Sequence, residues 1–270
     1  MPAPPTLSTL YRSCNQKEDI PMHDFEVELK TADGVLDCFV CHPEENGPHP
    51  AIILYMDAPG IREELRDMAR RMATTGYTVM LPNMYYRIGR EGHYGYDLSL
   101  IREDDSQRLK MFECMSSLIN AMVVDDTKVM LDFLRGHEAV APGPVGCVGY
   151  CMSGRYVVSV AAAYPDDFAA IASFYGVGIV TDEADSPHLK AGDIKGELYL
   201  AFASEDEYVP PALLERMPGI FEDAGCSHRI EIYPDTEHGF AFPQRPVYNK
   251  AAGERHWERL HALFDRNLKS

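Results

Sequence analysis

A repeated alternation of short, continuous apolar runs with longer segments of helical spacing constrains the fold of this chain most. The apolar runs, each typical of a strand buried on both faces, occupy residues 50–55, 77–81, 145–150, 169–175 and 198–203. The helical segments occupy residues 62–75, 105–136, about 153–164, 211–224 and 248–268. Strands that alternate with helices form parallel sheets. The pattern therefore predicts an α/β fold with a mostly parallel, doubly wound sheet and helices on both faces.

The first two strands are expected to be antiparallel. Residues 25–30 and 35–41 alternate polar and apolar side chains around the turn Thr31–Gly34, which predicts a hairpin at the N-terminal edge of the sheet. Residues 229–233 alternate in the same way and are expected to form the last strand.

One domain accounts for the whole chain. The 270 residues contain no internal repeat, low-complexity tract or linker, so a single domain is expected over residues 1–270. Residues 1–24 precede the first predicted strand and form an N-terminal extension. The long polar stretch 88–106 is predicted to be a lid or a wall of a pocket, because loops of that length usually have a function.

Charge and hydropathy exclude several classes of partner. The formal net charge is −17, which repels phosphate backbones and anionic lipid surfaces, so we expect no nucleic-acid and no membrane partner. No apolar stretch approaches the roughly 20 residues that a membrane helix needs. The N-terminus lacks the basic start and apolar run of a secretory signal, and a cytoplasmic location is expected.

The cysteines are expected to be reduced thiols. Seven of them are scattered through a chain that is long enough to fold without disulfides. The segment Cys38-Phe-Val-Cys-His42 spells a haem-attachment pattern and, with His49, suggests zinc. Residues 38 and 41 of one strand project to opposite faces, however, so no metal and no cofactor is expected.

The segment Gly149-Tyr-Cys-Met-Ser-Gly154 stands where a buried strand gives way to a helix. A nucleophile on such a sharp turn needs small neighbours, and the positive end of the following helix stabilises a thiolate. Cys151 is therefore a candidate nucleophile. The alternative is that Cys151 is a small apolar filler after the strand.

Two later segments supply the partners that a nucleophile at this turn needs, in the required chain order. Asp206 follows the strand 198–203, and its carboxylate would hold an imidazole in one tautomer; Glu205 is the fallback, and a turn or capping role is the alternative. His238 follows the strand 229–233 and precedes a glycine, a setting that the other nine histidines lack.

Together these segments resemble the dienelactone hydrolase (carboxymethylenebutenolidase) family of α/β-hydrolases, which carry a Cys-Asp-His triad. The resemblance extends from about residue 25 to 265. Its motifs are Gly149–Gly154, Glu205–Pro210, Glu237–Ala241, Tyr55–Ile61 and Leu81–Arg87.

The resemblance implies a role for each matching residue. Cys151 would be the nucleophile, His238 the general base and then acid, and Asp206 its orienting partner. The backbone N–H groups of Met152 and Ala58 would form the oxyanion hole.

The substrate-binding positions depart from the family pattern. In the family, a glutamate contacts the resting thiol, and Asp57 stands at the matching position of this chain. Asp57 either activates the thiol or only caps the turn in which Asp57 itself lies. Of two family arginines that grip a substrate carboxylate, Arg87 matches the first, whereas Phe242 replaces the second. This exchange predicts a less charged substrate. Other arginines that could restore the charge, each more simply interpreted as a solvated surface residue, are Arg62, Arg90 and Arg245.

The leading hypothesis is a hydrolase that cleaves small carboxylic esters or lactones through a cysteine nucleophile and a thioester acyl-enzyme. The departures at Asp57 and Phe242 keep open a non-catalytic ligand-binding protein on the same fold, and a redox-sensing thiol protein is a further alternative. The expected partner is a small-molecule ester or lactone substrate, and the expected oligomeric state is a monomer or homodimer.

Overall fold

The sheet has eight strands and is parallel except at its N-terminal edge. The structure is a computed structural model that describes residues 22–269. The strand order is β1-β2-β4-β3-β5-β6-β7-β8, with β2 antiparallel to both of its neighbours. The strands are β1 (Met22–Lys30), β2 (Val35–Pro43), β3 (Ala51–Tyr55), β4 (Thr78–Pro82), β5 (Val145–Tyr150), β6 (Phe168–Phe174), β7 (Glu197–Glu205) and β8 (His228–Glu237).

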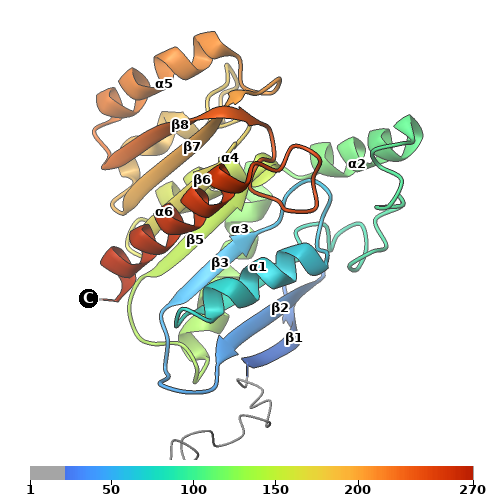
Figure 1. Cartoon of the computed structure of the whole chain (residues 1–270). Coiled ribbons are helices and arrows are strands. Elements are labelled where there is room, and N and C mark those ends of the chain that lie inside the picture. The colour runs from blue at the N-terminus through green and yellow to red at the C-terminus, as the bar shows by residue number, and fades with distance from the viewer. Residues whose placement is uncertain (1–21, 270) are drawn as a thin grey trace, which may run out of the picture.

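Helices cover both faces of this sheet (Figure 1). Helices α1 and α6 lie on one face, and α3 and α4 lie on the other. The helices are α1 (Glu63–Ala73), α2 (Asp105–Ser117), α3 (Asn120–Gly136), α4 (Gly154–Ala163), α5 (Pro211–Ala224) and α6 (Lys250–Leu268), with short 3₁₀ turns η1 (Cys151–Ser153) and η2 (Pro187–Asp193). The predicted α/β-hydrolase architecture, a doubly wound sheet with an antiparallel start, is confirmed.

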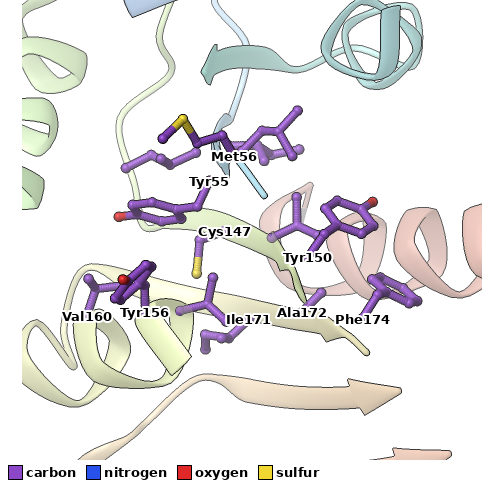
Figure 2. Packing of buried hydrophobic residues seen from close by; sticks show 14 of the residues in the cluster. Tyr55, Met56, Cys147, Tyr150, Tyr156, Val160, Ile171, Ala172 and Phe174 are labelled. Atoms are coloured by element: carbon purple, nitrogen blue, oxygen red, sulfur yellow. The ribbon is translucent and has the colours of Figure 1, made fainter. Parts of the chain in front are cut away.

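The central strands are apolar throughout because both of their faces are covered. Every residue of β3, β4 and β5 is buried. Side chains on the two faces of these strands pack against different helices (Figure 2). Cys147 and Ile171, which pair across β5 and β6, lie on the side of Tyr156 in α4. Tyr150 and Phe174 lie on the side of α6.

The element boundaries agree with the expectations to within a few residues, with one correction. The first strand begins at Met22 and not at residue 25, so residues 22–24 belong to β1; the remainder of the expected extension, residues 1–21, lies outside the described residues. The helical segment 105–136 is divided into α2 and α3 around Leu118. Within residues 22–269, no helix is both long and apolar enough to cross a bilayer.

This topology brings distant parts of the chain to one edge of the sheet. Strands β3, β5, β6, β7 and β8 run parallel, so the segments that follow them emerge at the same end. Ligands of open α/β sheets bind at the carboxyl ends of the strands. The residues after β5, β7 and β8 include Cys151, Asp206 and His238, which are therefore expected to meet.

Candidate active site

Cys151 stands in a strained turn between β5 and α4. Its φ is +54°, a left-handed conformation that costs a residue with a side chain about 1–3 kcal/mol. The turn continues through η1 directly into α4, so Cys151 lies at the N-terminal end of a helical segment. Unlike the other described cysteines, all buried, Cys151 is partly exposed. Accessibility and helix polarity both favour a reactive thiol at this position.

Glycines on either side make this turn possible. A Cβ atom on Gly149 would lie 2.4 Å from the carbonyl oxygen of Ser153, and one on Gly154 would lie 2.2 Å from the Cα atom of Gly176. The Val177 N–H donates to the Cys151 carbonyl over 3.0 Å, which fixes the turn against the end of β6. The predicted need for small neighbours thus has a direct steric cause.

His238 and Asp206 form a buried hydrogen-bonded pair. The His238 Nδ1 lies 2.8 Å from Asp206 Oδ2, and the other carboxylate oxygen accepts the Tyr208 N–H over 2.9 Å. The Asp206 side chain is fully buried, whereas Glu205 is exposed. Of the two acids considered, the structure therefore brings Asp206 to the histidine.

The surroundings of His238 favour its protonated form. Burial lowers its pKa, but the Asp206 carboxylate and the neighbouring Cys151 outweigh burial and raise the pKa to about 9. The ring is packed edge to face between Tyr175 and Tyr208, with centroid distances of 5.1 and 4.7 Å. Its Nε2 is buried and has no hydrogen-bond partner among the described residues. This nitrogen is free to exchange a proton with a reacting group.

A cavity of about 770 Å³ joins Cys151 and His238. Residues from the predicted pocket loop 88–106, among them Leu98 and Ile101, line one wall together with α2. The apolar lining side chains are Leu98, Ile101, Met111, Phe112, Met115 and Val177. The cavity therefore presents a largely apolar wall opposite the thiol.

Tyr85 connects the two expected oxyanion-hole segments. Its hydroxyl donates to the Ala58 carbonyl over 3.0 Å and lies 3.2 Å from the Met152 sulfur. Tyr96 also donates to the neighbouring Pro59 carbonyl over 2.9 Å. Ala58 lines the cavity beside Cys151. These contacts hold the loop after β3 next to the turn that carries the thiol.

The Asp57 carboxylate is engaged by two arginines. Arg62 donates to both of its oxygens over 2.6 and 3.1 Å, and Arg245 donates to Oδ2 over 2.6 Å. Burial raises the pKa of Asp57, but the two guanidinium groups outweigh it and hold the pKa below its ordinary value. The Arg62 guanidinium also binds Glu64 over 2.8 Å. All hydrogen bonds of the Asp57 side chain within residues 22–269 thus go to arginines, neither to the thiol nor to a turn amide.

Arg62 and Arg245 were interpreted from the sequence as solvated, and this is wrong for both. Their side chains are 14% and 15% exposed, and both line the cavity with Cys151. The sequence did not distinguish a paired from a solvated role, because Arg62 is five positions from Asp57 in a segment of unknown path and Arg245 is 188 positions from it. Arg90 is exposed and pairs with Glu28, as its surface interpretation predicted.

Arg87 and Phe242 do not line the cavity that contains Cys151. The Arg87 guanidinium binds Asp126 over 2.8 Å and Asp33 over 2.7 Å, and Arg87 is not among the residues that line the cavity. Phe242 is fully buried and packs beneath the guanidinium groups of Arg62 and Arg245. The structure therefore does not bring these two positions together around the thiol.

The Cys38–His42 segment gives no preformed metal site. Cys38 and Cys41 are buried in β2, and burial raises the pKa of both thiols. In the part of the chain that the structure describes, no group of three or more histidine, cysteine, aspartate or glutamate side chains is arranged to hold a metal ion.

The chain is similar in sequence to curated proteins that are named carboxymethylenebutenolidases. A "Putative carboxymethylenebutenolidase" from Synechocystis sp. is 29% identical over 234 residues, which cover 86% of this chain and 92% of the relative. The Carboxymethylenebutenolidase of Rhodococcus opacus is 24% identical over 229 residues, which cover 83% and 84% of the two chains.

Solved structures share the fold. The crystal structure of a "Putative Dienelactone Hydrolase" from Klebsiella pneumoniae superposes with a TM-score of 0.78 at 22% identity, and covers 90% of this chain and 98% of that one. The sequence model of the dienelactone hydrolase family matches residues 36–268. The chain therefore belongs to the dienelactone hydrolase family, whose named members act on ester or lactone bonds.

Proposed function

We propose that this protein hydrolyses small carboxylic esters or lactones through a thioester formed on Cys151. The observation that carries the proposal is the convergence of a strained, accessible thiol and a carboxylate-bound histidine on one cavity. Nucleophile, proton carrier and orienting acid are the three parts that acyl transfer by a cysteine requires.

Acylation begins with the thiolate of Cys151 and the imidazolium of His238. The sulfur attacks the carbonyl carbon, and the carbonyl oxygen takes the negative charge. The N–H groups of Met152 and Ala58 stabilise that oxyanion, an effect worth about 3 kcal/mol for each donor. As the C–O bond breaks, His238 gives its proton to the leaving oxygen, and the acyl group stays on sulfur as a thioester.

Deacylation reverses the role of the histidine. His238, now neutral, takes a proton from water, which attacks the thioester carbon. The C–S bond breaks, the carboxylic acid leaves, and the thiolate–imidazolium pair is restored. Asp206 keeps Nδ1 protonated throughout, so that Nε2 is always the nitrogen that exchanges protons.

The charges around the cavity favour an uncharged, apolar substrate. Arg62 and Arg245 are neutralised by Asp57 and Glu64, so neither offers a free guanidinium fork to a carboxylate. The facing wall is largely apolar, and of its two arginines Arg108 pairs with Asp105 while Arg102 donates to the Gln244 carbonyl. We therefore expect a neutral ester or lactone with a moderate apolar group to be a better substrate than a dianionic dienelactone.

The experiment compares wild type with Cys151→Ala on p-nitrophenyl acetate, simple lactones and a dienelactone. Loss of the nucleophile is expected to lower kcat/KM by at least about 10³-fold, and intact mass should show an acyl adduct on wild type only. The matched control is Cys226→Ala, a buried thiol whose sulfur contacts the Phe221 carbonyl and whose pKa burial raises. It should retain full activity. Equal rates for wild type and Cys151→Ala would contradict the proposal. Inactivity of wild type on every ester would favour the alternative of a non-catalytic binding protein.

A further inference from the structure

Tyr175 carries a buried hydroxyl that has no partner. The residue follows β6 and is fully buried, and its Oη makes no hydrogen bond with any described residue. Buried polar groups are almost always paired, because an unpaired one loses its water contacts and gains nothing in return. An exception at the edge of a candidate active site needs a cause.

The backbone of Tyr175 is strained and buttresses the thiol turn. Its φ is +40°, which a tyrosine adopts only when the surrounding structure imposes it. The Tyr175 N–H donates to the Ala201 carbonyl over 2.7 Å, and two residues later the Val177 N–H donates to the Cys151 carbonyl. The strained segment therefore places Tyr175 in a fixed position relative to the nucleophile.

The ring of Tyr175 supports the histidine. It meets the His238 ring edge to face at 5.1 Å, opposite Tyr208, and also contacts Phe240 at 5.2 Å. The Tyr175 side chain does not line the cavity. Its hydroxyl is therefore directed at protein groups and not at substrate.

The ionisable groups near this hydroxyl differ in whether they can accept its hydrogen bond. Burial holds the pKa of Tyr175 well above its ordinary value, so the phenol keeps its proton and remains a donor. The ionisable groups near it are Arg245, Tyr150, Asp57 and Cys151. Arg245 has no acceptor, the Tyr150 hydroxyl is paired with His256, and the Asp57 carboxylate is taken by two arginines. The sulfur of Cys151 remains, and it gains negative charge in the proposed reaction.

We propose that Tyr175 supports the thiolate of Cys151: its ring positions His238, and its hydroxyl becomes the hydrogen-bond donor to the sulfur once the sulfur is charged. The hydroxyl is unpaired because its partner is the ionised form of the nucleophile. This inference rests on the proposed function only for the role of Cys151 as nucleophile.

The test is Tyr175→Phe, which removes only the hydroxyl. The pH dependence of Cys151 alkylation by iodoacetamide, followed by peptide mass, should shift its midpoint upward by about one pH unit. The kcat/KM for p-nitrophenyl acetate at pH 7 should fall about 10-fold. The melting temperature should equal or exceed that of wild type, because no existing hydrogen bond is lost.

The matched control is Tyr77→Phe, which removes a buried hydroxyl that donates to Asp265 over 2.6 Å. Tyr77 precedes β4, whereas Cys151 follows the parallel strand β5, so the two residues lie at opposite ends of the sheet. It should lower the melting temperature by about 2–4 °C and leave the alkylation midpoint unchanged. An unshifted midpoint in Tyr175→Phe overturns the proposal, as does a larger loss of melting temperature than in the control. Alkylation by iodoacetamide needs no ester substrate. If the protein hydrolysed no ester but Tyr175→Phe still shifted the alkylation midpoint, the proposed role of Tyr175 would stand while the proposed function would fail.

Discussion

The protonation state of His238 depends on two neighbouring residues, Asp206 and Cys151. Its imidazole is buried, which alone would favour the neutral ring, yet the Asp206 carboxylate and the Cys151 sulfur reverse that preference. At neutral pH the ring is therefore an acid ready to protonate a leaving alkoxide. Loss of the Asp206 carboxylate would therefore lower the pKa of His238.

Asp206→Asn is predicted to move the pH profile. The pKa of His238 is about 9 in the folded protein and 6.5 for an unperturbed histidine, so kcat/KM for an alkyl ester should decline as pH rises through about 9. Removing the carboxylate lowers the His238 pKa, and the basic limb should move toward neutral pH with a loss of about 10³-fold at pH 8. Steady-state kinetics from pH 6 to 10 measure both effects. A basic limb that stays at the same pH would contradict the assignment.

The same pair makes a stability contribution of known sign. Because the folded-state pKa of His238 is raised, the stabilisation is complete below about pH 6.5 and is lost as pH rises through about 9. The cost of Asp206→Asn in urea unfolding should therefore be greater at pH 6 than at pH 10.

Single residues differed in how well the sequence revealed them. Cys151, Asp206 and His238 follow three parallel strands in a fixed chain order, so the sequence pattern alone placed them at one edge of the sheet. Arg62 and Arg245 gave no such signal, because an arginine in a loop has the same sequence pattern whether it is solvated or paired, as Arg62 is with acids two and five positions away and Arg245 with one 188 positions away. Tyr175 was equally invisible, since neither its positive φ nor its unpaired hydroxyl has a sequence signature.

At the level of elements, the junction between β5 and α4 is the most tightly packed part of the site. Its helix begins so close to the segment after β6 that Gly154 and Gly176 meet backbone to backbone. The strands and helices themselves were predictable because apolar runs and helical spacing are local patterns. The sequence predicts only that the loop before α2 is a lid or a pocket wall. The polar residues of this loop show no periodicity, so their course along the cavity could not be predicted.

Gly154→Ala is predicted to disrupt this junction. The new methyl group would lie 2.2 Å from the Gly176 Cα atom, so backbone must move, at a cost of about 1–3 kcal/mol and about 10²-fold in kcat/KM. Gly219→Ala in α5 is the control, because no atom lies within 4 Å of its added Cβ. It should stabilise the protein by about 0.5–1 kcal/mol with unchanged activity. Urea unfolding and ester kinetics measure both; an active, fully stable Gly154→Ala would show that the contact is easily relieved.

For the whole molecule, the formal charge of −17 sets the field through which a substrate approaches. Arg87, which the family resemblance implies as a binding group for a substrate carboxylate, is engaged by two acids and does not line the cavity. Of the four arginines that line the cavity, Arg62, Arg108 and Arg245 are paired with acids, and Arg102 donates to the Gln244 carbonyl. The global charge and the pairing of three of these arginines therefore both disfavour an anionic substrate.

Salt is predicted to separate charged from neutral substrates. Raising ionic strength from about 10 to 150 mM shortens the screening length from about 30 to 8 Å and weakens the repulsion of an anion. The kcat/KM for an ester that carries a carboxylate should rise several-fold over this range, while that of its neutral analogue stays constant. A rate that falls with salt for the anionic ester would mean that the cavity attracts anions.

The Asp57–Arg245 contact closes a loop of 188 positions and joins a residue after the third strand to one beyond the last. Loop-closure entropy opposes such a contact until most of the intervening chain is ordered. The cavity wall therefore cannot exist in a partly folded chain, even one with a complete central sheet. The turn that carries Cys151 precedes Arg245 in the chain, so the charges that line the cavity beside the thiol are complete only once the C-terminal segment has packed.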